Sequence, residues 1–448
     1  MAEKVDIVGA GLVGPLMAIY LARKGFRVSL HERRPDIRKT KISAGRSINL
    51  ALTARGLRSL EEVGLRDEVM KIAIPMKGRM VHDLQGNTNL QPYSQKAEEV
   101  IYAVSRGVLN MMLLDAAEKH DGVEMTFNRR CSQYDLDKNA LTFTDEKGGG
   151  VETVMAATII AADGAGSAVR KALLAGAGND AYSESFLEYG YKELEIPPTE
   201  NGGFRMEPNA LHIWPRHSYM MIALPNTEGS FTVTLFYPKE GEGSFAQLKD
   251  PSSIMAFFRK NFADAVPHMP ELERDFMSNP TGALVTVKCS RWHAGGKAVL
   301  MGDAAHAIVP FFAQGMNSGF EDCAVLNGLI SSDKPDWESV FRNFAQARKP
   351  NADAIADMAV ENFIEMRDSV ANPQFLLRKK VGFELEKRWP DRFIPRYSMV
   401  VFRPDIPYAE AQRRGLLQDR ILDQLCADIS APEQLDWIKA EMLLRSMI

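Results

Sequence analysis

The chain has 448 residues, of which 45% are hydrophobic and 25% charged, and its formal net charge at pH 7 is −4. This length allows two or three domains with buried cores, and the composition excludes a disordered or fibrous protein. The small negative charge gives no basis for a nucleic-acid partner or for attraction to an anionic membrane.

The number and spacing of the cysteines and histidines indicate which kinds of cross-link and metal site to expect. The four cysteines lie far apart without a C-x-x-C pair, and the eight histidines show no metal-ligand spacing. The sequence therefore predicts neither disulfides nor a metal site, and it favours a reducing cytoplasm. The apolar run over 5–22 is interrupted by Asp6, glycines and Pro15, and no other apolar run reaches about 18 residues. We expect no membrane span.

The N-terminal segment predicts a strand, a helix and a second strand. Residues 5–8 are apolar, a helical pattern follows to about residue 24, and residues 26–31 alternate as a strand does. This arrangement is typical of the beginning of a doubly wound parallel sheet.

A glycine-rich loop, GAGLVG, joins the first strand to the helix. Gly9 permits a tight turn, Gly11 lets a pyrophosphate approach the backbone, and Gly14 lets helix and strand pack closely. Glu32, at the end of the second strand, is placed to bind ribose hydroxyls. The loop predicts a dinucleotide site. Two further candidate cofactor contacts are Val13 and Arg33. For Arg33, Arg34 and Arg170, a contact to phosphate competes with an ordinary solvated position.

Two later motifs also end strands. ADGAGSAVR (162–170) follows the apolar residues 157–161, and MGDAAH (301–306) follows a strand over 298–301. Alone, Asp163 or Asp303 could be a turn-capping aspartate, but the carboxyl end of a strand is also where a ribityl chain is bound. All three motifs in this order predict one FAD site, and therefore redox chemistry.

A helix is expected after the third motif, from the segment FFAQGMN (311–317) to about residue 329. Its N-terminus would face the flavin ring, because the partial positive charge there favours the reduced, anionic ring. Met316 and Asn317 in this segment are candidate cofactor contacts.

The middle of the chain has a different pattern. Alternating stretches over 210–214, 219–224 and 230–237, with turn residues before the last, predict an antiparallel sheet. From Trp337 onward the pattern is helical, and prolines at 350, 373, 390 and 404 are expected to separate the helices. We predict an α/β fold, with a Rossmann-like FAD-binding domain (1–75, 98–181 and 284–336), an inserted antiparallel β-sheet substrate domain (76–97 and 182–283) and a C-terminal helical segment (337–448).

These motifs resemble the single-component aromatic hydroxylases, which are FAD-dependent monooxygenases that use NAD(P)H. Strings along nearly the whole chain resemble one family among them, the kynurenine 3-monooxygenases. The strings are GRSINLAL (45–52), KGRMVH (77–82), LQPY (90–93), EPNALHIWP (207–215), SFTVTLF (230–236) and RFIPRYSMV (392–400).

The resemblance implies a substrate site on the inserted sheet and the C-terminal helices. The amino-acid group of the substrate would be held by Arg79, Tyr93, Tyr397 and Asn362, with Glu365 and Met366 one turn further on. A guanidinium suits a carboxylate. Phe236 and Phe311 are candidates to flank the substrate ring, with core packing as the alternative. Arg106, in SRGVLN, matches a flavin-contacting arginine.

The resemblance also implies a reaction, hydroxylation of L-kynurenine at ring position 3 in tryptophan degradation, on the route to pyridine nucleotides. FAD would be tightly bound, NADPH would bind transiently, and O2 would be the co-substrate, reacting as a flavin 4a-hydroperoxide. No catalytic side chain beyond the flavin is expected. The alternatives are hydroxylation of another aromatic acid, a flavin oxidoreductase that transfers no oxygen, and a nucleotide-binding protein without enzymatic activity.

The chain departs from the family pattern in two places. Ala313 stands where the family has glycine, so a positive φ there would cost stability or shift the loop. The C-terminal membrane-anchoring segment of eukaryotic members has no counterpart, and we expect the bacterial type without an anchor.

Overall fold

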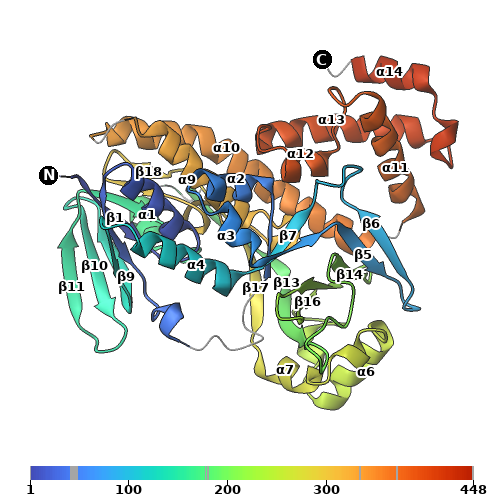
Figure 1. Ribbon diagram of the computed structural model, residues 1–448, viewed down its shortest axis with the longest axis horizontal. Helices are drawn as coiled ribbons and strands as arrows, with labels where there is room; N and C mark the ends of the chain where they lie inside the picture. The colour runs from blue at the N-terminus through green and yellow to red at the C-terminus, as the bar shows by residue number, and fades with distance from the viewer. Residues whose placement is uncertain are drawn as a thin grey trace. The chain divides into compact units, whose positions relative to one another are not determined.

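The computed structural model describes residues 2–40, 49–176, 178, 181–331, 334–369 and 372–445. Residues 45–48 of the GRSINLAL string lie outside this part. The chain forms two compact units (Figure 1). Unit 1 comprises Met1–Ala73, Ala103–Leu187 and Ala283–Ala356, and unit 2 comprises Ile74–Tyr102, Glu188–Gly282 and Asp357–Ile448.

Unit 1 is built on a six-stranded sheet in the order β18-β19-β12-β1-β2-β8. The pairs from β19 to β8 are parallel, and the short β18 adds an antiparallel edge. The strands expected at all three motifs are therefore confirmed, and they are neighbours in one sheet. The bounds are β1 Lys4–Val8, β2 Arg27–His31, β8 Val123–Thr126, β12 Thr158–Ala161, β18 His293–Ala294 and β19 Ala298–Leu300.

Two helices of unit 1 come after the first and third motifs in the chain. Helix α1 (Val13–Arg23) follows the glycine loop, and α9 (Gly315–Leu329) follows the third motif, both as expected. Between them in sequence come α2 Ala54–Glu62, α3 Arg66–Met70, α4 Arg106–Glu118, α5 Ala168–Leu173 and α8 Asp303–His306. Unit 1 also contains a three-stranded antiparallel sheet of β9 Arg129–Asp135, β10 Ala140–Asp145 and β11 Val151–Met155.

In unit 2 the strands run in the order β13-β16-β15-β14-β5-β6. The predicted antiparallel sheet is confirmed, with one pair that differs: β14 and β5 are parallel. The sheet packs on the buried apolar faces of α6 (Pro251–Asn261) and α7 (Leu272–Ser278). The strands are β5 Gly78–His82, β6 Thr88–Pro92, β13 Tyr182–Ile196, β14 Leu211–Pro215, β15 Met220–Pro225 and β16 Phe231–Pro238.

The C-terminal region is helical from Trp337 onward, as predicted. A second apolar core joins α11, α13 and α14. Residues 337–356 belong to unit 1 and 357–448 to unit 2, so a separate C-terminal domain stays a prediction. The elements are α10 Trp337–Ile364, the π-helix Glu365–Ser369, α11 Pro373–Arg388, α12 Arg396–Phe402, α13 Tyr408–Cys426 and α14 Trp437–Arg445.

One proline prediction is wrong. Pro350 lies inside α10, which continues through it for fourteen residues to Ile364. Asn351 donates to the carbonyl of Ala347 (2.8 Å), and Lys349 pairs with Asp353 one turn on. Tertiary packing of a long helix with such local contacts outweighs the loss of one backbone hydrogen bond. The prolines at 373, 390 and 404 do lie at helix ends.

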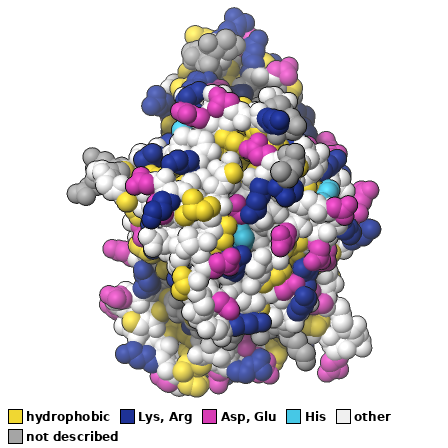
Figure 2. Space-filling model, turned by 90° about the vertical axis from the view of Figure 1, so that its left-hand side faces the viewer, with side chains coloured by type: hydrophobic (Ala, Val, Ile, Leu, Met, Phe, Trp, Pro, Cys, Tyr) yellow, Lys and Arg dark blue, Asp and Glu magenta, His cyan; other side chains and the backbone are white. Residues whose placement is uncertain are grey.

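The chain passes between the units inside regular elements rather than in loops. The crossing points fall in β4 (Ala73–Met76), β7 (Ile101–Ser105), β13, β17 (Thr281–Cys289) and α10. On the face drawn in Figure 2, basic and acidic side chains are interspersed, in line with the small net charge. In the part of the chain that is described, no helix has the length and apolar character needed to span a membrane.

Candidate functional site

The glycine loop has the geometry that a dinucleotide requires. Gly9 has φ +101°, and a Cβ there would lie 2.3 Å from the carbonyl oxygen of Ala162 in the second motif. A Cβ on Gly14 would lie 2.0 Å from the carbonyl oxygen of Gly9, whereas a Cβ on Gly11 would meet only open space. Gly9 and Gly14 are thus required by packing. Gly11 leaves room above the loop.

The start of α1 is suited to an anion. Its N-cap, Leu12, makes no side-chain capping bond, and its first turn contains no acidic residue. Backbone N–H groups at a helix N-terminus then remain for phosphate oxygens.

Glu32 is buried and holds the loop directly. One carboxylate oxygen accepts from the N–H of Ala10 (2.8 Å), and the other accepts from the N–H of Arg34 (2.9 Å). On the other side, Asn110 of α4 donates to the carbonyl oxygens of Ala10 (3.1 Å) and Gly11 (2.8 Å). We did not predict Asn110, although it ends the SRGVLN string one helical turn after Arg106. Arg106 itself is exposed as the first residue of α4, and Arg33 is exposed after β2.

The second motif leaves one acidic oxygen unpaired. Asp163 accepts from the N–H of Ala168 through Oδ2 (2.9 Å), while its buried Oδ1 has no hydrogen-bond partner among the described residues. Burial raises the pKa of Asp163, and hydrogen bonds from Ser167 and from backbone N–H groups oppose this rise. A hydroxyl or N–H of a bound cofactor would satisfy such an oxygen.

Arg170 is not a surface residue. It is 1% exposed, and its guanidinium donates to the carbonyl oxygens of Ala304 (2.7 Å) and Ala165. It therefore connects the second motif to the third instead of reaching solvent or a phosphate.

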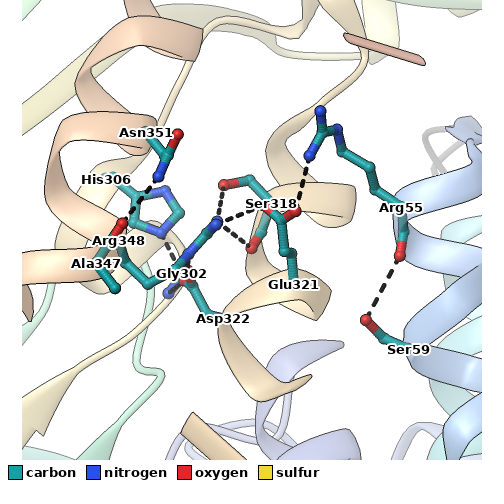
Figure 3. A network of polar contacts seen from close by, with 10 residues as sticks. All are labelled: Arg55, Ser59, Gly302, His306, Ser318, Glu321, Asp322, Ala347, Arg348 and Asn351. Atoms are coloured by element: carbon teal, nitrogen blue, oxygen red, sulfur yellow. Dashed lines mark hydrogen bonds and ion pairs between the residues drawn. The ribbon is translucent and has the colours of Figure 1, made fainter. Parts of the chain in front are cut away.

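The third motif turns at Gly302, whose φ of +54° and ψ of −140° favour glycine. The N–H of Gly302 donates to Oδ2 of Asp322 (2.9 Å), a residue of α9. His306 Nε2 lies 2.6 Å from the same oxygen, and Nε of Arg348 donates to Oδ1 (2.7 Å). Figure 3 shows Asp322 between these partners. Asp303, which follows Gly302, is exposed.

The charge of Asp322 is stabilised by its partners. Complete burial alone would raise its pKa, but His306, Arg348 and the N–H of Gly302 lower it to about 2. The network continues to Glu321, which pairs with Arg348 and with Arg55 of α2 (2.8 Å; Figure 3). The turn that presents Asp303 is thus held by a buried ionic network.

The first and third motifs meet at Val13. A Cβ on Gly302 would lie 3.0 Å from Cγ2 of Val13, and a Cβ on Gly319 would lie 2.7 Å from the same atom. Met316 is buried in the first turn of α9, which has no side-chain cap. The turn before this helix places Ala313 at φ +55°, ψ +33°, the left-handed conformation that the family's glycine would adopt freely.

Asn317 has a structural role. Its amide accepts from the N–H of Thr53 (2.9 Å) and donates to the carbonyl oxygens of Ala51 (2.9 Å) and Ala313 (2.7 Å). These bonds use all the hydrogens of its side chain. A cofactor could still contact its backbone or the second lone pair of Oδ1.

In unit 2, four residues expected at the substrate site come together. Arg79, on β5, is 6% exposed, and its guanidinium lies over the rings of Tyr397 (5.2 Å) and Tyr93 (5.8 Å). These two rings stack at 5.2 Å and 10°. Glu365 forms an ion pair with Arg79 at 3.5 Å, and Nε of Arg79 has no hydrogen-bond partner within the described residues.

The electrostatics of this cluster follow from burial. Burial would lower the pKa of Arg79, but Tyr397 and Glu365 hold it above its ordinary value. Burial raises the pKa of Tyr93 to about 12, although Arg79 opposes the rise, so this tyrosine stays neutral. Burial and the charge of Arg79 lower the pKa of Lys379, on α11, to about 8, although Glu365 opposes the change. Lys379 was not predicted from the sequence.

The other residues expected at the substrate site are Asn362, Met366 and Phe236, which lie in unit 2, and Phe311, which lies in unit 1. Asn362 donates to Sδ of Met366 (3.3 Å), and both are buried at the end of α10 and the start of the π-helix. Phe236 is buried on β16 of unit 2, and Phe311 is buried in unit 1. The ring-flanking role of these two phenylalanines stays a prediction. Within the described ranges, no group of three or more His, Cys, Asp or Glu side chains could hold a metal ion.

The fold and the three motif turns define an FAD-binding protein. Residues 2–333 match the family described as FAD binding domain. Solved structures show the same fold, at TM-scores of 0.67 for a 2-methyl-3-hydroxypyridine-5-carboxylic acid oxygenase (20% identity, covering 84% of this chain and 95% of that one) and 0.64 for Pseudomonas aeruginosa PqsL in complex with 2-aminobenzoylacetate (20% identity, 82% and 97%).

Full-length relatives specify the family within this class. The chain is 49% identical over 446 residues to a kynurenine 3-monooxygenase of Myxococcus xanthus (100% of this chain, 96% of the relative). It is 47% identical over 450 residues to one of Stenotrophomonas maltophilia (100% and 97%). The chain belongs to the kynurenine 3-monooxygenase family of FAD-dependent enzymes.

Proposed function

We propose that the protein hydroxylates L-kynurenine at ring position 3. The reaction consumes NADPH, a proton and O2 and yields 3-hydroxykynurenine, NADP+ and water. The names of the full-length relatives support this substrate.

The observation that carries the proposal is the buried guanidinium of Arg79. A charged side chain is rarely buried with a free donor, because the unpaired donor costs about 1–3 kcal/mol. The carboxylate of an amino acid would satisfy Nε of Arg79 and would gain a charge-assisted hydrogen bond. The two stacked tyrosine rings keep the guanidinium in one orientation.

Glu365 adds a negative charge beside the positive charge of Arg79. Its carboxylate is 27% exposed and lies 3.5 Å from Arg79, a long distance for an ion pair. A zwitterionic amino acid would place its carboxylate on Arg79 and its ammonium group near Glu365. This arrangement favours an amino acid over an aromatic monoacid such as a hydroxybenzoate, which lacks the ammonium group.

The residues of unit 1 would hold FAD. The N-terminus of α1 and the space at Gly11 suit the pyrophosphate, and Asp163 and Asp303 offer carboxylate oxygens for hydroxyl groups. Bound FAD, reduced by NADPH, supplies the activated oxygen for ring hydroxylation. The described side chains need only bind, orient and exclude water, in line with the absence of a candidate nucleophile from the sequence analysis. We also place the protein in the cytoplasm, where its four free cysteines would stay reduced.

The test is a product assay with purified enzyme. NADPH oxidation is followed with L-kynurenine, with 4-hydroxybenzoate and without substrate, and the products are analysed by mass spectrometry. We expect kynurenine to stimulate NADPH oxidation and to gain one oxygen atom. Hydroxybenzoate turnover would favour the other aromatic-acid hydroxylases, and NADPH oxidation without oxygenated product would favour a flavin oxidoreductase.

A further inference from the structure

Unit 2 contains a buried row of hydrogen bonds that the proposed reaction does not use. His82, the last residue of β5, contacts Oδ2 of Asp264 through Nδ1 (2.7 Å) and Nδ1 of His212 through Nε2 (2.8 Å). His212, on β14, contacts the carbonyl oxygen of Glu207 through Nε2 (2.8 Å). The two histidines are 6% and 2% exposed.

The number of protons in this row is fixed by its two ends. The carbonyl oxygen of Glu207 can only accept a hydrogen bond. Asp264 is ionised, because His82 and Trp214, which donates to Oδ2 at 2.8 Å, lower its pKa against the effect of burial. Three contacts in a row between two acceptors need three protons. Two neutral imidazoles carry only two, so the histidine pair holds one extra proton and a positive charge.

The extra proton belongs on His82. Burial lowers the pKa of His212 to about 4, although the contact with Glu207 opposes the change. His212 is therefore neutral near pH 7, donates through Nε2 and accepts through Nδ1. On this count of protons His82 would donate from both nitrogens. Its ring stacks on that of Trp214 with the centroids 4.1 Å apart, and its Nδ1 lies 2.7 Å from Oδ2 of Asp264.

This row of hydrogen bonds holds β5, the strand that carries Arg79, in place. β5 and β14 are paired in parallel with Arg79 opposite Leu211, and side chains alternate along a strand. His82 and Arg79 therefore point to opposite faces of the sheet. Asp264 lies between α6 and the short helix at Val266–His268, so the row connects β5 to the helical layer behind it.

Arg216 strengthens the same junction through the backbone. Its guanidinium donates to the carbonyl oxygens of His82 (3.0 Å), Asp83 (3.2 Å) and Asn261 (2.6 Å). The other charges acting on the junction are those of Asp83, His268 and, through His268, Arg205.

We propose that the His82–His212 pair holds one extra proton, carried by His82, in the folded enzyme and that this ionised pair, with Asp264, positions Arg79 for the substrate carboxylate. His82 is a positioning residue, and only this positioning role rests on the proposed function. Loss of the proton leaves two lone pairs facing each other at 2.8 Å, which forces the histidines apart and loosens β5.

The pair gives stability a defined pH dependence. An unfolded histidine titrates near about pH 6.5, so the unfolded chain binds more protons than the folded pair below this pH and fewer above it. Stability from the pair therefore rises with pH up to about 6.5 and falls beyond it, by up to about tenfold in the unfolding constant per pH unit.

The first test is nitrogen-15 NMR of the wild-type holoenzyme with labelled histidine, assigned with single variants. At pH 7 we expect two protonated nitrogens in His82 and one in His212. Two neutral rings would overturn the proposal, and this readout does not depend on enzymatic activity.

The second test compares His82→Gln and Asp264→Asn with His268→Gln, which removes a neighbouring histidine outside the row. In the first two variants, the KM for kynurenine rises about tenfold while kcat stays within about twofold, since binding geometry is lost but the chemistry is not. In these two variants the free energy of unfolding also lacks the maximum near about pH 6.5, whereas His268→Gln retains this maximum. Unchanged KM and an unchanged stability profile would overturn the proposal. Wild-type enzyme that does not hydroxylate kynurenine would overturn the proposed function and leave the NMR result standing.

Discussion

The two units differ in how completely their buried charges are paired. In unit 1, Asp322 is saturated by Gly302, His306 and Arg348, and its pKa is about 2. In unit 2, Arg79 keeps a free donor and has one ion pair at 3.5 Å. A saturated network rigidifies a turn for a cofactor that stays bound, whereas an unsaturated one is ready for a ligand that comes and goes.

The largest expected effect follows from replacing Asp322, the fully paired buried carboxylate of unit 1. Asp322→Asn removes the buried carboxylate that Gly302, His306 and Arg348 contact, while Arg348 keeps its ion pair with Glu321. We expect this change to cost about 3–5 kcal/mol of the free energy of unfolding. We also expect weaker FAD binding, because Gly302 loses the anchor of its N–H group. Urea unfolding and a fluorescence titration of apoprotein with FAD measure the two effects.

The control for this variant is Glu321→Gln in the same network. Glu321 is 17% exposed and makes no contact with Gly302 in the described network, so a smaller loss is expected. Equal losses in both variants would remove the special role of Asp322. Because the pKa of Asp322 is lowered, its contribution is present above pH 4 and lost as pH falls toward 2; the variant lacks this acid-side loss.

A smaller effect is expected from replacing Arg79, the residue of unit 2 whose Nε has no hydrogen-bond partner among the described residues. Arg79→Ala removes a charge-assisted contact worth about 1.5–3 kcal/mol, which lowers kcat/KM for kynurenine by about 10–100-fold. Arg413→Ala, at an exposed ion pair on α13, serves as the control and should leave the kinetics unchanged. Steady-state kinetics with unaltered kcat/KM in Arg79→Ala would exclude this cluster as the substrate site, and the unpaired donor of Arg79 would then have no role in binding.

The smallest expected effect concerns two turns of unit 1 with positive φ. Ala313→Gly removes the cost of a left-handed alanine and should stabilise the protein by about 0.5–1 kcal/mol, after the entropy cost of glycine. Gly302→Ala is the reciprocal change and should destabilise, since its Cβ would meet Val13 at 3.0 Å. Thermal unfolding of the two variants gives the signs, and the same sign for both would contradict this account.

Much of the fold could be predicted because its determinants are local. The apolar strands before the three motifs, the glycine loop and the alternating strands of unit 2 are each encoded within a few consecutive residues. The substrate cluster was found differently, since Arg79, Tyr93 and Tyr397 came from a family resemblance. The parallel pairing of β14 with β5 had no local cue, because it joins strands separated by more than a hundred residues.

The cofactor class, the family and the order of the strands along the chain could all be read from consecutive residues. Which polar groups meet became known only from the folded chain: Asn110 contacts Gly11, Asp322 contacts Arg348, and His82 contacts Asp264, at separations of 99, 26 and 182 residues. The tertiary structure also buried Arg170 and extended α10 through Pro350. The physical reason is that local periodicity encodes which face of an element is apolar, whereas the partner of a buried charge is selected by the packing of distant elements.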